Sequence, residues 1–128
     1  MTAIPTPIAF KGAPASPFTR KMQALLRYRQ IPYRYLIGNR AELLGMPKPR
    51  VELLPTFYLP NSDGVVEAVT DSTPLIRRFE SAFDGRSVRP PQPALAFLDS
   101  LLEDFADEWV SRIMFHYRWH YAADADKA

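Results

Sequence analysis

The hydrophobic positions along the chain predict short buried strands that alternate with amphipathic helices. Four apolar runs have the length and the aromatic or β-branched content of strands, and they cover residues 8–10, 33–37, 56–59 and 65–69. Two other stretches repeat hydrophobic side chains at steps of three and four, as one face of a helix does. The first begins near Ser16, and the second begins near Asp71 and runs to about Phe83.

Proline, glycine and capping residues mark the ends of these elements. Ser16-Pro17 is a typical helix start, with a serine that caps the first turn and a proline at the first helical position. Residues 60–64 favour a turn, so the strands on either side of them are predicted to form a hairpin. Residues 40–44 have room for only one or two helical turns before Gly45.

The second part of the chain has a different pattern. Residues 85–93 are rich in proline and predict an extended linker. Beyond it, hydrophobic residues recur at helical spacing over residues 95–116, which predicts one long amphipathic helix, whereas residues 122–128 carry no packing signal. We therefore expect an α/β domain over residues 1–84, in the order βαβ–short α–ββα around one four-stranded mixed sheet. The start of an all-α domain then covers residues 94–128.

Composition and charge narrow the classes of function. The net charge of +2 comes from scattered basic and acidic residues, which gives no reason to expect a nucleic-acid or membrane partner. The chain has no cysteine, which excludes disulfides, thiolate metal sites and a cysteine nucleophile of the glutaredoxin type. Residues 1–10 lack the features of a secretory signal and no apolar run is long enough to span a bilayer, so the default location is the cytoplasm.

Three local motifs, in this order of elements, resemble the N-terminal domain of the glutathione S-transferase superfamily. Ala15–Lys21 looks like the active-site turn of serine-type transferases, especially the plant tau class. Leu54–Phe57 is similar to the family's cis-proline element, and Asp71–Pro74 is similar to its Glu/Asp-Ser pair. The resemblance covers about residues 7–121 and implies a thioredoxin-like fold.

The resemblance also implies a function and a set of site residues. Glutathione is the expected co-substrate, a small electrophile is its expected acceptor, and detoxification is the corresponding role. Ser16 would stabilise the glutathione thiolate without attacking anything itself. Leu54 and Pro55 would meet the cysteinyl part of glutathione across a cis peptide bond, and Asp71 and Ser72 would hold its γ-glutamyl end. Members of the family are commonly dimers, which makes a homodimer one candidate assembly.

Each site residue also has an ordinary structural interpretation. A free thiol has a pKa near ~8.5, so a hydroxyl donor at a helix N-terminus would favour the thiolate. Ser16 also fits a plain helix cap, with Thr19 one turn later as the reserve hydroxyl. Asp71 and Ser72 fit two residues competing to cap the next helix, and Pro55 fits a proline at the start of a strand.

Several features leave the function open. The family often has a basic residue just before the cis-proline motif, but here Glu52 leads into it, with Lys48 and Arg50 nearby. A non-catalytic glutathione-binding or protein-interaction module on the same fold is therefore the alternative. His116 and His120 have metal-ligand spacing, but their aromatic neighbours favour packing, and no metal is expected.

The second domain is expected to be incomplete. In the family the electrophile site lies between the first domain and a bundle of several helices, and only the first of those helices is present in this sequence. We therefore expect a fragment, or a domain that another chain completes.

Overall fold

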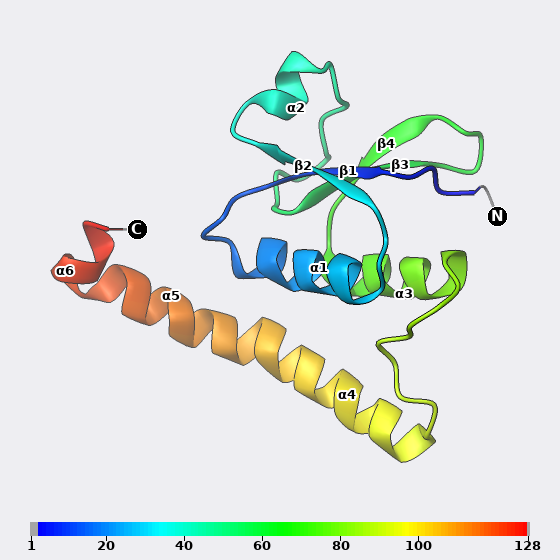
Figure 1. Ribbon diagram of the computed structural model, residues 1–128. Helices are drawn as coiled ribbons and strands as arrows, with labels where there is room; N and C mark the ends of the chain where they lie inside the picture. The colour runs from blue at the N-terminus through cyan, green and yellow to red at the C-terminus, as the bar shows by residue number, and fades with distance from the viewer. Residues whose placement is uncertain (1–2, 128) are drawn as a thin grey trace. The chain divides into compact units, whose positions relative to one another are not determined.

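The computed structural model describes residues 3–127 and contains one four-stranded mixed sheet (Figure 1). Its strands are β1 (Ile8–Gly12), β2 (Tyr33–Ile37), β3 (Thr56–Pro60) and β4 (Val66–Val69), in the order β2-β1-β3-β4. β1 and β2 are parallel, whereas β3 is antiparallel to both β1 and β4. The predicted α/β fold, with its βαβ and ββα halves, is confirmed.

Helices cover both faces of this sheet. α1 (Pro17–Tyr28) and α3 (Ser72–Ala82) lie on one face, and the short α2 (Arg40–Leu43) lies on the other (Figure 1). Because strand side chains alternate, Phe10 and Phe57 point toward α1 and α3, where they join the main core with the fully buried Phe79. Tyr58 points the other way, into a smaller cluster beneath α2.

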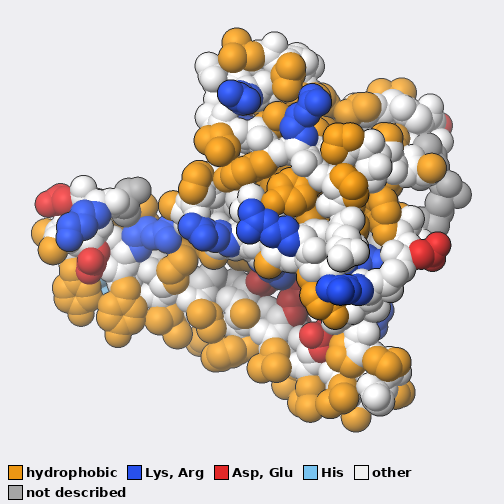
Figure 2. Space-filling model, in the orientation of Figure 1, with side chains coloured by type: hydrophobic (Ala, Val, Ile, Leu, Met, Phe, Trp, Pro, Cys, Tyr) orange, Lys and Arg blue, Asp and Glu red, His pale blue; other side chains and the backbone are white. Residues whose placement is uncertain are grey.

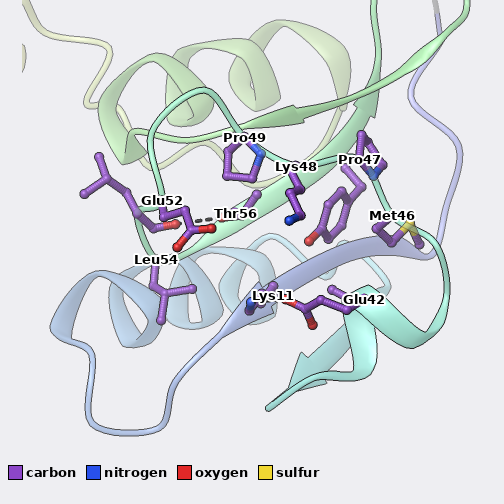
Figure 3. Close-up of a pocket in the computed structure, with 12 residues that line it drawn as sticks. Lys11, Glu42, Met46, Pro47, Lys48, Pro49, Glu52, Leu54 and Thr56 are labelled. Carbon is purple, nitrogen blue, oxygen red and sulfur yellow. Dashed lines mark hydrogen bonds and ion pairs between the residues drawn. The ribbon is translucent and has the colours of Figure 1, made fainter.

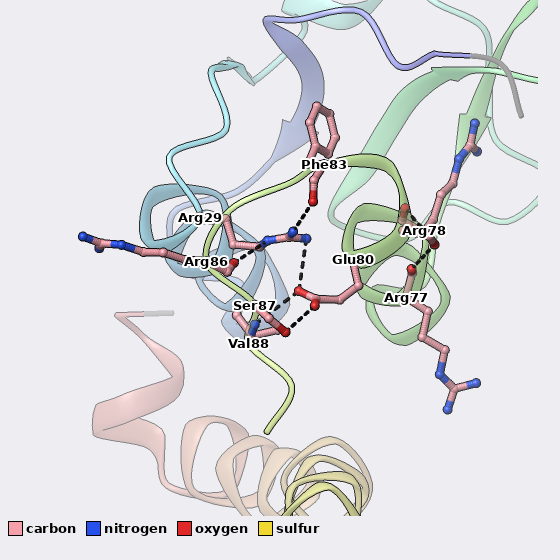
Figure 4. A network of polar contacts seen from close by, with 9 residues as sticks. Arg29, Arg77, Arg78, Glu80, Phe83, Arg86, Ser87 and Val88 are labelled. Carbon is pink, nitrogen blue, oxygen red and sulfur yellow. Dashed lines mark hydrogen bonds and ion pairs between the residues drawn. The ribbon is translucent and has the colours of Figure 1, made fainter. Parts of the chain in front are cut away.

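A buried arginine ties the end of α1 to α3 and to the segment after it (Figure 4). Arg29 is only 6% exposed. Its Nη1 lies 3.0 Å from Glu80 Oε1, so the two side chains form an ion pair, although Nη1 makes no hydrogen bond among the described residues. Its other nitrogens donate to the carbonyl oxygens of Phe83 and Arg86, at 2.6 and 2.8 Å. Glu80 in turn accepts hydrogen bonds from residues 87 and 88, at 2.6 and 3.2 Å.

The chain divides into two compact units between Val88 and Arg89, inside the predicted linker. The second unit consists of α4 (Pro93–Phe105), a π-helical segment η1 (Ala106–Val110), α5 (Ser111–His120) and α6 (Ala122–Ala125). The long predicted helix is therefore present, but it contains a wider turn, and a short helix follows it. Ser111 donates its hydroxyl proton to the carbonyl of Asp107, one turn back, and this bond accompanies the wider turn.

Apolar side chains of the second unit are exposed (Figure 2). Phe105 and Trp109 are 52% and 62% exposed, and none of the residues in its described helices is buried. Over residues 3–127, no helix combines the length and the apolar character that crossing a membrane requires.

Candidate functional site

Strand register brings the predicted site residues to one end of the sheet. β1 ends where β3 begins, with Lys11 paired to Thr56. β4 ends at the same place, with Val69 paired to Phe57. The segments that leave β1 and β4 therefore converge with the segment that enters β3. These three segments carry Ser16, Leu54, Pro55, Asp71 and Ser72.

Ser16 is the N-cap of α1, as the Ser-Pro pattern predicts. Its Oγ accepts a hydrogen bond from the backbone N–H of Thr19 at 3.2 Å. A serine hydroxyl has two lone pairs and one proton, so accepting this bond leaves the proton available for another acceptor. Capping the helix and donating to a ligand are therefore chemically compatible at Ser16.

Thr19, the reserve hydroxyl, lies inside the fold. Its side chain is fully buried, and its Oγ1 accepts a hydrogen bond from the backbone N–H of Ala13 at 3.3 Å. The end of β1 approaches it so closely that a Cβ added to Gly12 would lie 2.7 Å from Thr19 Cγ2. Thr19 thus holds the turn that presents Ser16.

The segment that enters β3 contains a cis peptide bond between Leu54 and Pro55, in agreement with the family resemblance. Thr56 Oγ1 donates to the carbonyl oxygen of Leu53 at 2.6 Å, which closes a tight turn around this bond. Leu54 is 36% exposed, so the residue before the proline is accessible from solvent.

The two residues predicted at the start of α3 occupy different capping positions. Asp71 is the N-cap, and its Oδ1 accepts a hydrogen bond from the backbone N–H of Thr73 at 3.3 Å. Its backbone has φ 78° and ψ 118°, a conformation that L-residues rarely adopt. Ser72 is the first residue of the helix and is 5% exposed.

Lys21 reaches from α1 to the start of α3. Its Nζ donates a hydrogen bond to Ser72 Oγ at 3.2 Å. This contact places an ammonium group beside the N-terminus of α3, where backbone N–H groups already favour an anion.

A cavity of about 440 Å³ opens on the α2 side of the sheet, next to Leu54 (Figure 3). Its lining includes the charged residues Lys11, Glu42, Lys48 and Glu52, together with Leu54 and Tyr58. Of the two basic residues near the cis-proline motif, Lys48 belongs to its described lining and Arg50 does not.

Two of the lining side chains form an ion pair. Lys11 of β1 donates to the carboxylate of Glu42 in α2. This hydrogen bond raises the pKa of Lys11 and lowers the pKa of Glu42. Behind the pair, burial raises the pKa of the Tyr58 phenol, which therefore remains protonated at neutral pH.

No group of three or more metal-ligating side chains occurs among the described residues. The rings of His116 and His120 stack on each other, with centroids 4.7 Å apart.

The amino-acid sequence matches the family model for the glutathione S-transferase, N-terminal domain, over residues 10–87. The chain belongs to this family. The matched span contains all three converging segments, so the resemblance drawn from the motifs is confirmed. No individual characterised protein and no solved structure matches the chain significantly.

Two features of this glutathione S-transferase domain were missed by sequence reasoning. The sequence pattern places Lys21 on the polar side of α1 and predicts a solvated residue. Its contact with Ser72 was not predicted because Ser72 lies 51 positions further along the chain. Arg29 contacts residues that lie 51 to 57 positions further along the chain, and nothing in the local pattern distinguishes this arginine from its basic neighbours.

Proposed function

We propose that this glutathione S-transferase-like protein binds glutathione at the converging end of the sheet and transfers it to a small electrophile. The observation that carries the proposal is the geometry of Ser16. Its oxygen caps α1 through a lone pair, which leaves a hydroxyl proton at the N-terminus of that helix. The start of α3 and the Leu54-Pro55 bond lie at the same end of the sheet.

The proposed chemistry is stabilisation of a thiolate. The glutathione thiol loses its proton to solvent, and the sulfur anion accepts a hydrogen bond from Ser16. The N-terminus of α1 contributes a partial positive charge and free N–H groups, which also favour the anion. The thiolate then forms a sulfur–carbon bond to the electrophile, and in a substitution the leaving group departs with its bonding electrons.

The remaining contacts are assigned by chemistry and by place. Asp71 would pair with the α-amino group of the γ-glutamyl end, and Ser72 with its α-carboxylate. Backbone groups of Leu54 would meet the cysteinyl part. The cavity next to Leu54 would take the glycine end, with Lys48 as the nearest basic candidate for its carboxylate.

The proposal is tested at Ser16 by conjugation kinetics with a nitroaromatic halide and by a glutathione titration followed by amide NMR. Ser16→Ala removes the donor, and losing one such hydrogen bond slows catalysis by about 10²-fold or more. It also removes the cap, which costs about 1 kcal/mol of stability.

Two further variants separate these effects. Ser16→Asp keeps the cap but offers no proton and repels a thiolate, so it is expected to be as inactive as Ser16→Ala. Ser16→Thr keeps both the cap and the hydroxyl, so it is expected to retain most of the activity. An unchanged rate in Ser16→Ala or in Ser16→Asp would overturn the assignment.

The non-catalytic alternative is supported by Glu52, which stands where the family often has a basic residue. Amide shifts at Ser16, Leu54 and Asp71 with no conjugation of any electrophile would favour that binding module. A homodimer and a cytoplasmic location rest on the family and on the sequence alone, and they stay predictions.

A further inference from the structure

We propose that the cavity next to Leu54 is a subsite for thiols that extend beyond glycine, and that it favours an extension carrying an amine. The ligand class is γ-glutamylcysteinyl thiols whose third unit is larger than glycine and ends in an ammonium group. This inference rests on the proposed function, because it takes the backbone of Leu54 as the place where the cysteinyl part binds. It starts from the size of the cavity and the charges of its lining (Figure 3).

The cavity is larger than a glycine residue needs. Its volume of about 440 Å³ lies within the range of ~300–1,000 Å³ that is typical of pockets enclosing a complete small ligand. Glycine has no side chain, so a glycine end bound beside Leu54 would leave most of this space to water. A longer third residue, or a group attached to the glycine carboxyl, would fill that space instead.

Much of the lining suits a chain of methylene groups. Tyr58 of β3 is 8% exposed and forms part of the lining. The segment between α2 and β3 adds apolar side chains from Met46, Pro47, Pro49, Leu53 and Leu54. The prolines fix their own backbone angles, so this wall of the cavity is partly ordered before a ligand binds. Methylene groups placed here would leave water for apolar contacts, which favours binding.

The charges of the lining leave one carboxylate and one ammonium for a ligand. Lys11 and Glu42 form an ion pair with each other. Within residues 3–127, neither Lys48 nor Glu52 makes a hydrogen bond or an ion pair. A glycine carboxylate would use only Lys48 and would leave Glu52 without a partner. An added ammonium group would give Glu52 an opposite charge, and this is why we assign an amine to the extension.

Two kinds of thiol have this chemistry, and Lys48 distinguishes between them. A tripeptide with lysine as its third residue keeps its terminal carboxylate, which would face Lys48, while its side-chain ammonium would face Glu52. A glutathione whose glycine carboxyl is joined to a diamine through an amide has lost that carboxylate and keeps only the ammonium. Both extensions pass along the apolar lining and end at Glu52.

The test measures dissociation constants by calorimetry for the full chain. The ligands are glutathione, the γ-glutamylcysteinyl tripeptides that end in lysine or in norleucine, and the diamine amide of glutathione. Norleucine has the methylene chain of lysine without its charge. The norleucine tripeptide is expected to bind about tenfold more tightly than glutathione, as burial of about two methylene groups would give. The lysine tripeptide should gain about another threefold, within the range of an exposed ion pair.

Three variants assign these gains to side chains. Glu52→Gln should abolish the preference for lysine over norleucine and leave the preference for norleucine over glutathione unchanged. Glu67→Gln removes the same charge from β4, outside the described lining, and is the matched control that should change neither preference. Lys48→Met should weaken the lysine tripeptide by about threefold and should not weaken the diamine amide, which has no terminal carboxylate.

The failures of the two proposals are distinguishable. A norleucine tripeptide that binds no more tightly than glutathione would overturn the extended subsite, while glutathione binding itself stood. Equal affinity for the lysine and norleucine tripeptides, or the same preference for lysine in Glu52→Gln as in the wild type, would overturn the assignment of an amine. A wild-type chain that binds none of these thiols at millimolar concentration would overturn the proposed function and this inference together.

Discussion

Asp71 combines an unusual backbone conformation with a side chain that caps α3. It holds a backbone conformation with φ 78° that costs a non-glycine residue about 1–3 kcal/mol, and such conformations concentrate at functional sites. Glycine would adopt it more easily but would lose both the helix cap and the carboxylate. The presence of aspartate is therefore consistent with a role for its side chain in ligand binding.

Asp71→Asn separates that role from the structural one. Asparagine caps helices as well as aspartate does and tolerates positive φ, so the free energy of unfolding in urea should change by less than about 0.5 kcal/mol. The lost charge should weaken glutathione binding by about tenfold, as expected for a charge-assisted hydrogen bond. Asp71→Ala should lose both stability and affinity. Unchanged glutathione affinity in Asp71→Asn would show that the carboxylate only caps α3.

Residues with a local signal were predictable, and residues whose roles depend on distant contacts were not. The capping positions of Ser16 and Asp71 could be predicted, because a capping side chain bonds to a backbone N–H within three residues along the chain. The burial of Thr19 and the reach of Lys21 depend on the end of β1 and the start of α3. Those neighbours become visible only once the sheet is assembled.

At the scale of elements, the joint between β1 and α1 positions Ser16. β1 ends against Thr19 with no space for a side chain at Gly12, whose added Cβ would also lie 2.9 Å from Tyr35 Cε2. Burial raises the pKa of the Tyr35 phenol, whose hydroxyl has no hydrogen-bond partner among the described residues. The joint therefore depends on tight packing around Gly12.

Gly12→Ala should destabilise this joint. Overpacking of this kind typically costs about 1–3 kcal/mol in the free energy of unfolding. Thr19→Ser removes the Cγ2 that the new methyl group would strike and keeps the hydroxyl that accepts from Ala13. A double-mutant cycle in urea should therefore show Thr19→Ser costing less in the Gly12→Ala background than in the wild type. Strict additivity of the two changes would argue against a clash between these residues.

The spacing of hydrophobic residues predicted the four strands, α1, α3 and the long helix that begins with α4, because each has a face that must be buried. It did not predict the wider turn at η1, since the apolar steps of four around Trp109 also fit an α-helix. It assigned no structure to α6, whose four residues are small and carry no apolar stripe.

At the scale of the whole molecule, the segment after α3 belongs to the first unit. The buried Arg29 binds the carbonyl oxygen of Arg86, and Glu80 accepts from residues 87 and 88. Val88 also packs against the main core. A pattern of prolines and turns cannot indicate these contacts, because they depend on a buried ion pair between α1 and α3.

The network therefore predicts where the first unit can be shortened. A chain that ends at Val88 keeps every bond around Arg29 and Glu80, whereas a chain that ends at Asp84 loses three of them. A neutral hydrogen bond contributes about 0.5–1.5 kcal/mol, and one to a charged group contributes more, so the shorter chain should be less stable by at least roughly 2 kcal/mol. Circular dichroism in urea measures this difference, because both tryptophans, Trp109 and Trp119, lie beyond the shortened chains.

Glu80→Gln provides the internal control for this comparison. It leaves the charge of Arg29 without its carboxylate, and breaking a buried ion pair in this way costs about 3–5 kcal/mol in the chain that ends at Val88. The penalty for ending at Asp84 should shrink in that background, because the bonds from residues 87 and 88 no longer reach a charged acceptor. Equal stability of the two shortened chains without this substitution would instead place the end of the folded unit at Asp84, with the network adding nothing to it.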